Sequence, residues 1–325
     1  MKRWLLPLAA PLFALSATLA CTQASAQTPK PPMRIIVPFA AGGASDFYSR
    51  IVAQKITEQT GKTIVVENRT GAGGRIAFEY AAHAPNDGSV VALIDATYAM
   101  LPGLFDKRLP WDINSDLVPA AMITQTPFVI IVPTKSKYQT LMDLINDAKA
   151  RPGKLNFGSA GVGSVNHIVT ERFRSDAKIT ITHIPYRGMS EASVALQAGE
   201  LDLIIAASPT ALGPIQGGKV RALAVTTAKR SAALPNVPTA SEAGVPPYIT
   251  TNWFGWAVPK GTSKEFIQTL HEDVVKAVNS PDVRDRLAAQ GAEPSNFTTE
   301  DFARFLREDT KRWTDVIKAN NIKIE

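Results

Sequence analysis

The sequence predicts an α/β fold with two similar halves. Apolar runs of strand length alternate with helical stretches along most of the 325 residues, and short glycine-bearing turns join them. This alternation is typical of strands and crossover helices in mainly parallel sheets. Each half begins alike, because residues 34–50 and 154–173 both read as strand, glycine-rich loop and helix. At roughly 100–200 residues per domain, the length fits two domains.

The first 26 residues have the features of a secretory signal peptide. A short basic start precedes an apolar run to Ala20, and Ala24-Ser25-Ala26 supplies small residues for cleavage. Cys21, the only cysteine, raises a second possibility, in which a lipid-modified cysteine begins the mature chain. Thr18 fits that pattern poorly, since leucine is usual there. We therefore expect cleavage after Ala26, which leaves a mature chain without a thiol.

Charge and hydropathy exclude two classes of partner. The formal net charge is +6, and removal of Lys2 and Arg3 with the signal peptide lowers it by two. The remaining lysines and arginines are scattered, without the basic stripe or motif of a nucleic-acid-binding protein. After the signal peptide, no segment reaches the ~20 apolar residues of a membrane span. We expect no nucleic acid and no membrane insertion.

The first half contains three predicted strands and two helices. Residues 33–37 form a buried strand, and residues 45–60 form a helix that Gly61 ends. The same patterns predict the rest of this half: a strand over 63–67, a helix ending at 82 and a strand over 90–94.

The second half repeats these patterns and is followed by a helical C-terminal part. A proline-dense loop covers 235–247, and residues 250–258 have strand character. The predicted strands lie at 128–132, 154–157, 180–184, 201–206 and 220–226, and the helices cover 141–150, 165–173 and 191–198. Three C-terminal amphipathic helices, at 263–279, 281–290 and 299–320, are expected to cover the first sheet.

The two glycine-rich loops are the best candidates for an anion site. Gly42 and Gly43 precede a helix that begins with Ser45 and Asp46, and the loop from Gly158 to Ser164 precedes the other. Unpaired N–H groups and the helix dipole favour a carboxylate at such positions. If the two halves face each other, the loops form the two walls of one cleft at the carboxyl ends of strands. For Asp46, helix capping is the favoured role.

Motifs of cofactor, metal and enzyme chemistry do not match. Gly71–Gly74 resembles a dinucleotide fingerprint, but Ile76 stands where the third glycine belongs. Gly61-Lys62-Thr63 lacks the leading glycine of a P-loop, and no GxSxG is present. The four histidines have no metal-ligand spacing; they are His83, His167, His183 and His271. We expect no cofactor, no metal and no catalytic residue.

Three polar residues leave alternatives open. His167 either supports the second loop by hydrogen bonds or contacts the ligand. Asp95 ends a strand, and inside a cleft its charge would repel an acid and favour an amine or a hydroxyl. Asp202 opens a strand after Gly199, where tying down a turn is the favoured role.

Taken together, these segments resemble the periplasmic substrate-binding receptors of tripartite tricarboxylate transporters, the Bug or TctC type. Each segment alone is weak, whereas their order and spacing are specific. The matching segments are 34–38 with 42–46, 66–69 with 71–74, 84–88, 152–155, 158–161 with His167, 185–188, 199–202, 234–239 with 242–244, 253–255 and 259–262.

The resemblance implies a two-domain periplasmic binding protein, a Venus flytrap of type II-like topology with two crossover strands near 120–132 and 250–258. Domain 1 is expected at 27–126 plus 251–325, and domain 2 at 127–250. It further implies a periplasmic monomer that captures a small organic carboxylate and delivers it to the membrane subunits of such a transporter. Typical ligands of the family are di- or tricarboxylates, acidic amino acids and aromatic acids. A secreted α/β enzyme using His167 or Asp95, and a binding protein used for sensing only, are the alternatives.

In this family the first loop, here 39–43, holds one ligand carboxylate, and the second, 158–164, holds the distal end. The predicted ligand contacts are Phe39, Ala41, Gly42, Gly43, Asp46, Asp95, Thr97, Tyr98, Gly158, Ser159, Ala160, Gly161, Ser164, His167, Tyr186 and Asp202. Ala41 stands where proline is frequent, and residues 95–98 replace a small, neutral stretch. Tyr48 and Tyr98 either stack on an aromatic ligand or pack in the core. These departures put a plain C4-dicarboxylate in doubt.

Overall fold

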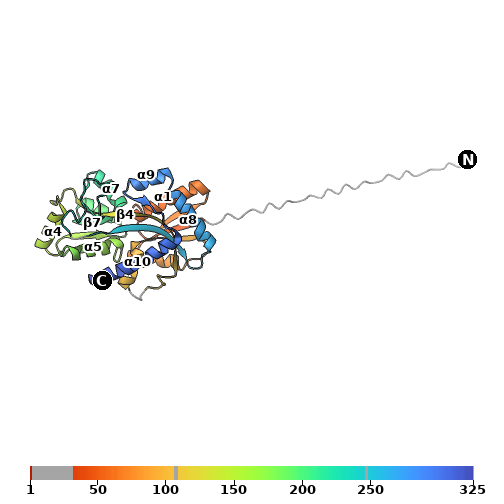
Figure 1. The fold of residues 1–325 in the computed structure, drawn as a ribbon, viewed down its shortest axis with the longest axis horizontal. Coiled ribbons are helices and arrows are strands. Elements are labelled where there is room, and N and C mark those ends of the chain that lie inside the picture. The colour runs from red at the N-terminus through yellow and green to blue at the C-terminus, as the bar shows by residue number, and fades with distance from the viewer. Residues whose placement is uncertain (2–31, 106–108, 246–247, 325) are drawn as a thin grey trace. The chain divides into compact units, whose positions relative to one another are not determined.

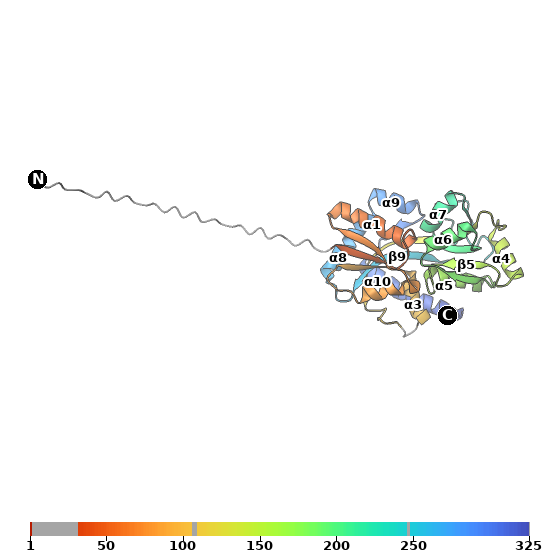
Figure 2. The ribbon, with the colours of Figure 1, turned by 180° about the vertical axis from the view of Figure 1, so that it is seen from behind.

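One long strand, β4 (Leu117–Pro133), connects the two halves of the fold. The computed structural model describes Met1 and residues 32–105, 109–245 and 248–324, so the predicted signal peptide beyond Met1, with Cys21, lies outside the described residues. From Leu117 to Pro127, β4 pairs antiparallel with β9 (Thr251–Pro259), and from Phe128 onward it pairs with β7 and β8. Figure 1 labels β4 between helices α4 and α8, which lie at opposite ends, and Figure 2 shows the same two helices from behind.

We call the part of the sheet on the β9 side, with its helices, the first lobe. Its strand order is β2-β1-β3-β9-β4, with β10 also paired to β4. The strands are β1 (Met33–Val37), β2 (Ile64–Asn68), β3 (Val90–Asp95), β9 and β10 (Glu293–Pro294). The helices are α1 (Ala44–Thr60), η1 (Ala72–Gly74), α2 (Arg75–Ala82), α3 (Ala96–Phe105), α8 (Lys264–Val278), α9 (Pro281–Ala288) and α10 (Thr299–Ala319).

We call the other part the second lobe, with strand order β4-β7-β5-β6 and β8 paired to the end of β4. The strands are β5 (Asn156–Ser159), β6 (Thr182–Pro185), β7 (Leu203–Ala207) and β8 (Val220–Val225). The helices are α4 (Leu141–Ala150), α5 (Val165–Asp176), α6 (Met189–Ala198) and α7 (Ser208–Gln216). Strands β1, β2 and β3 of the first lobe run parallel to one another, as do β5, β6 and β7 of the second, which agrees with the alternating pattern.

Helix ends agree with their local sequence. Gly61 ends α1 with φ of 70°, a left-handed conformation that costs glycine little. The side chains of Ser164 and Ser263 accept hydrogen bonds at the starts of α5 and α8, and Thr140 and Thr298 form capping boxes. Capping accounts for the accuracy of these predicted helix starts.

Sequence analysis missed two helices, α3 and α7. Helix α3 is apolar on nearly every side and contains Pro102, so it has no amphipathic period to detect. Helix α7 begins with Ser208-Pro209 and contains Gly213 and Pro214, residues that usually indicate a loop. Both helices follow directly from strands, and burial in a packed environment compensates for their low intrinsic preference.

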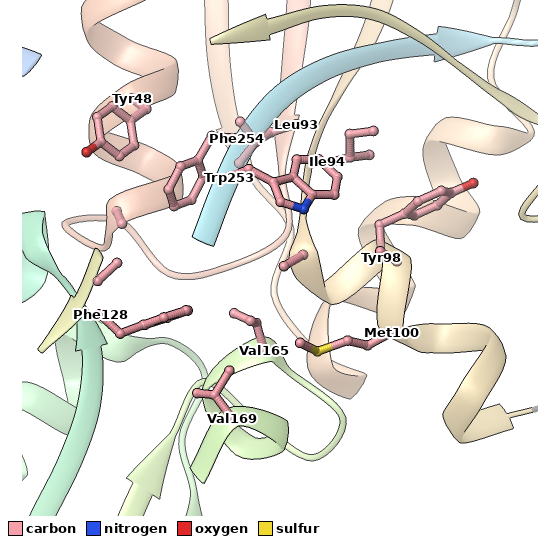
Figure 3. Packing of buried hydrophobic residues seen from close by; sticks show 14 of the residues in the cluster. Tyr48, Leu93, Ile94, Tyr98, Met100, Phe128, Val165, Val169, Trp253 and Phe254 are labelled. Atoms are coloured by element: carbon pink, nitrogen blue, oxygen red, sulfur yellow. The ribbon is translucent and has the colours of Figure 1, made fainter. Parts of the chain in front are cut away.

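One hydrophobic cluster of buried residues extends through both lobes. Fully buried aromatic side chains gather near β9, where Tyr48 lies beside Phe254 and Phe128 lies close to Val165 (Figure 3). A second cluster in the second lobe includes Val129 and Leu196. None of the described helices is both long and apolar enough to cross a membrane.

Candidate functional site

A small cavity of about 20 Å³ lies where the lobes meet. From the first lobe its walls are Phe39, Gly43, Ala44, Ser45, Asp95 and Asn252. From the second lobe they are Ala160, Asn166, Met189, Ala207 and Thr210. A space of this size holds about one water molecule, so any organic ligand requires the lobes to separate further than they do here.

Five of the described helices begin at this cavity, and one of them, α3, starts directly after the lining residue Asp95. Gly43 is the N-cap of α1, Gly188 precedes α6, and Ala207 precedes α7, and none of these three starts has a side-chain cap. Helix α5 contributes Asn166 from its first turn. Uncapped helix starts present unpaired N–H groups and positive partial charge. The convergence of several such starts makes the cavity favourable for a carboxylate.

The first loop is held in shape by Asp46. Its carboxylate accepts hydrogen bonds from Gly42 N at 3.0 Å, Arg50 Nε at 2.9 Å and Asn68 Nδ2 at 3.0 Å. Burial raises the pKa of Asp46, but these bonds outweigh it and lower the pKa below its usual value. Asn68 Nδ2 also donates to the carbonyl of Phe39 at 2.9 Å. Asp46 thus positions the loop and does not line the cavity.

The second loop is supported by two stacked histidines. Gly163 N donates to His167 Nδ1 at 3.1 Å, and the His167 and His183 rings stack with centroids 3.9 Å apart. His183 Nε2 lies 2.6 Å from Ser159 Oγ, which also bonds the backbone of Gly161. Burial lowers the pKa of His167 to about 3 and that of His183 to about 4, so both are neutral near pH 7. The contacts of His167 are those of the first alternative, in which it supports the second loop by hydrogen bonds.

His167 also lines a separate cavity on the second lobe, with Glu171 and Arg174. Glu171 pairs with Arg174 at 2.6 Å. In the described part of the chain, no group of three or more His, Cys, Asp or Glu side chains is arranged to hold a metal ion.

Asp95 is the one titratable side chain among the described residues that line the cavity between the lobes. It is 1% exposed, and its Oδ1 accepts a hydrogen bond from Thr97 N at 3.0 Å. Burial raises its pKa to about 6, while hydrogen bonds from Thr97 and Asn252 oppose the shift. Asn252 Oδ1 in turn accepts from Ala96 N and Trp253 N. The cavity therefore combines one acidic side chain with several helix starts.

The lobes touch around this cavity. Val165 N, at the start of α5, donates to Thr97 Oγ1 at 3.0 Å. Phe39 of the first loop packs into the hydrophobic cluster of the second lobe, with Ala160 and Met189. A Cβ added to Gly188 would lie 2.7 Å from Ala40 Cβ, so the backbones there approach closely. The structure thus has the lobes in contact across the site.

Four of the predicted contacts line the cavity: Phe39, Gly43, Asp95 and Ala160. The other predicted residues lie off its walls: Ala41, Gly42, Asp46, Thr97, Tyr98, Gly158, Ser159, Gly161, Ser164, His167, Tyr186 and Asp202. Several of them have other partners. Asp202 accepts from Asn156 N at 2.7 Å, which ties down a turn, the favoured alternative. Ser164 caps α5.

The two tyrosines have the contacts of the second alternative, packing in the core. Tyr98 is fully buried and its hydroxyl donates to the carbonyl of Ile113 at 2.9 Å. Tyr48 is also fully buried and packs on Phe254 with ring centroids 4.7 Å apart. Apolar neighbours on α1, α3 and β9 draw both rings into the core, away from the cavity.

Sequence analysis did not select seven lining residues: Ala44, Ser45, Asn166, Met189, Ala207, Thr210 and Asn252. Most of them lie at strand-to-helix junctions, the signal that selected the two glycine-rich loops. The junction at Ala207–Thr210 was hidden because α7 itself was not predicted. Asn252 begins a crossover strand, where no glycine or helix start draws attention to it.

Comparison with known proteins gives one consistent family. Residues 48–322 match the family model "Tripartite tricarboxylate transporter family receptor". The chain is 33% identical to the protein BugT of Bordetella pertussis over 97% of each chain. A structure described as R. palustris Rpa4515 with adipate is 32% identical to this chain and has a TM-score of 0.87. The match covers 91% of this chain and 99% of that one.

A third relative is MatC from Rhodopseudomonas palustris, whose structure is described with bound malate. It is 28% identical, with a TM-score of 0.85, over 89% of this chain and 99% of that one. These likenesses confirm the two-domain periplasmic-binding-protein fold with two crossover strands. The family and its solved neighbours are solute-binding proteins rather than enzymes. The chain belongs to the receptor family of the tripartite tricarboxylate transporters, the TctC or Bug type.

Proposed function

We propose that the protein is an extracytoplasmic receptor that captures a small organic carboxylate between its lobes and delivers it to the membrane subunits of a tripartite tricarboxylate-type transporter. One observation carries the proposal: helix starts from both lobes, three of them without side-chain caps, converge on one cavity. Free N–H groups at helix starts stabilise a carboxylate. The solved relatives with adipate and malate support the same ligand class.

The hinge of the receptor lies where β4 changes partner from β9 to β7 and where β9 begins. Pro127↔Thr251 is the last pair of β4 with β9, and Phe128↔Ala207 begins the pairing with β7. This change supports domain boundaries at 126/127 and 250/251. Ligand that binds better to the closed form shifts the open–closed equilibrium toward it. The signal-like N-terminus supports a periplasmic location.

A thermal-shift screen followed by calorimetry tests the binding claim. The panel contains di- and tricarboxylates, acidic amino acids and aromatic acids, together with their uncharged amides as controls. A carboxylate should raise the melting temperature in a concentration-dependent way, whereas its amide should not. The proposal fails if no carboxylate shifts the melting temperature, or if amides bind equally well.

Delivery to a transporter needs a separate test. Cells that lack the gene should lose uptake of the radiolabelled ligand, and expression of the wild-type chain should restore it. Unchanged uptake in the deletion strain, with binding intact in the purified protein, would favour the sensing role instead.

A further inference from the structure

We propose that Asp95 is the counter-ion for an ammonium group of the ligand, so that the ligands are amino acids or other carboxylates that carry an amine. The inference rests on the proposed carboxylate-binding function and narrows it. Asp95 lines the cavity that the helix starts also line. The site therefore has two poles of opposite sign, which match a zwitterion.

Other buried carboxylates of this protein have a cationic partner. Asp46 pairs with Arg50 at 2.8 Å, Glu171 pairs with Arg174, and Asp309 pairs with Arg312. Asp95 is buried at least as deeply, and none of the ion pairs between described residues includes it. A buried charge without a partner is costly. The three paired carboxylates indicate how the protein otherwise compensates such a charge.

The hydrogen bonds of the Asp95 carboxylate come from neutral groups. Its Oδ1 accepts from Thr97 N and so caps the start of α3, which is a structural role. A carboxylate has about four acceptor positions on its two oxygens. Thr97 and Asn252 supply the remaining polar contacts of the side chain, and both are neutral. Capping thus explains the presence of an acceptor, but Asn, Ser or Thr would cap equally well without a charge in the cavity.

The part of the cavity wall that the second lobe forms also supports the inference. Helices α5, α6 and α7 begin there and favour the carboxylate of the ligand. A plain dicarboxylate would bring its second carboxylate against Asp95, and like charges in a dry site repel strongly. A ligand hydroxyl would donate a hydrogen bond to the Asp95 carboxylate but would not neutralise its charge, whereas an ammonium group would do both.

Matched ligand pairs test the inference. Calorimetry at pH 7.5 compares L-aspartate with succinate and L-malate, and L-glutamate with glutarate. Any amine-bearing carboxylate that scores in the thermal-shift panel is compared with its analogue lacking the amine. Removing one partner of a buried charge pair typically costs about 2 kcal/mol or more, so each amino compound should bind about 30-fold tighter or more than its analogue.

The variant Asp95→Asn keeps the shape and an acceptor for Thr97 N but removes the charge. It should abolish most of the preference for the amine and leave the analogue's affinity unchanged or improved. Asp87→Asn is the matched control, because Asp87 Oδ1 accepts from Ser89 N at 2.9 Å in the same local geometry, on the exposed surface. The control should keep the wild-type preference. If Asp95→Asn does not fold, Asp95→Ser, which retains a capping oxygen, replaces it.

Three results would overturn the inference. They are equal or tighter binding of succinate or L-malate than of L-aspartate, a best ligand without an amine, and an amine preference that survives in Asp95→Asn. In each case carboxylate binding persists, so the proposed function stands while the inference falls. Absence of binding by every carboxylate would remove the proposed function itself.

Discussion

At the scale of single residues, Asp95 links stability to pH. The pKa of an ordinary aspartate is 3.8, and burial raises that of Asp95 to about 6 in the folded protein. Between these values the folded state binds more protons than the unfolded state, so stability falls as pH rises from about 4 to about 6 and stays low above it. At 1.36 kcal/mol per unit, the cost near pH 8 is about 2–3 kcal/mol.

Asp95→Asn should therefore be more stable than the wild type at pH 8 in the absence of ligand. The difference in stability should narrow toward pH 4, because Asp95 is then protonated in the folded protein and increasingly protonated in the unfolded chain. Urea unfolding at pH 8, 6 and 4.5 measures this difference in the free energy of unfolding between the variant and the wild type. A gap that does not change with pH would show that Asp95 carries no uncompensated charge in the folded protein.

Asp46 gives a second prediction at this scale, as the residue that holds the first loop. Asp46→Ala removes the acceptor for Gly42 N, Arg50 and Asn68. Each unpaired buried group typically costs about 1–3 kcal/mol, so chemical denaturation should show a loss in that range, and calorimetry a weaker ligand affinity. Asp46→Asn keeps an acceptor and should lose less. Equal losses in the two variants would contradict the loop-holding role.

Residue types alone did not distinguish the residues that line the cavity from those that have structural roles elsewhere. Gly43 and Asp95, two of the predicted ligand contacts, line the cavity, and a glycine turn and a strand-ending acid both have local signatures. Tyr98 and Ser164 have equally suitable chemistry, yet one is buried in the core and the other caps a helix. The difference depends on which face of α3 and α5 is turned inward, and packing decides that.

At the scale of elements, closure depends on close backbone approach between lobes. Gly188 precedes α6 with an extended φ of −174°, which any residue adopts. An added Cβ would lie 2.7 Å from Ala40 Cβ and 2.8 Å from Ala40 N, across the cavity mouth. A side chain here interferes with the closed form and leaves each lobe intact.

Gly188→Ala should therefore weaken ligand binding without lowering the melting temperature of the free protein. Overpacking costs typically about 1–3 kcal/mol, which corresponds to roughly 5- to 150-fold in affinity. Gly213→Ala in α7 is the control, because nothing lies within 4 Å of its added Cβ. Wild-type affinity in Gly188→Ala, measured by calorimetry, would argue against this contact in the ligand-bound form.

Elements with a clear period or cap were predicted well, and the two missed helices had neither. Helix α1 begins one residue before the predicted start and ends at the predicted Gly61. Helices α3 and α7 form because buried neighbours surround them, in spite of Pro102 and Pro214. Because α7 was not predicted from the sequence, Thr210 was not selected as a site residue either. Tertiary context is the information that local sequence lacks.

At the scale of the whole molecule, ligand entry requires an opening motion. The cavity of about 20 Å³ is too small for a carboxylate ligand, and the lobes meet through contacts such as Val165 N to Thr97 Oγ1. The free protein in solution must therefore sample forms in which the lobes lie farther apart.

Small-angle scattering should record this motion. Saturating ligand should reduce the radius of gyration, and Gly188→Ala should reduce that compaction while Gly213→Ala retains it. Identical scattering with and without a ligand that binds by calorimetry would mean that the free protein is already closed and that entry follows another route.

The order of segments along the chain fixed the family and the overall fold better than any single site residue. Glycine loops, caps and proline-rich turns recur from residue 34 to residue 262 at specific spacings, and the family match over residues 48–322 confirms the interpretation. The site is less predictable because it is assembled from several strand-to-helix junctions in two lobes. Only the folded chain shows that Asp95 and Asn252 lie beside the helix starts of the second lobe.

The most direct test of the receptor claim is a crystal structure of protein purified without denaturation and soaked with its tightest carboxylate. We expect ligand density between the two glycine-rich loops, with a carboxylate at the N–H groups of the helix starts and an amine within hydrogen-bond distance of Asp95. Density for the ligand only outside this cavity, or a ligand carboxylate placed against Asp95 with the helix starts unoccupied, would contradict this expectation.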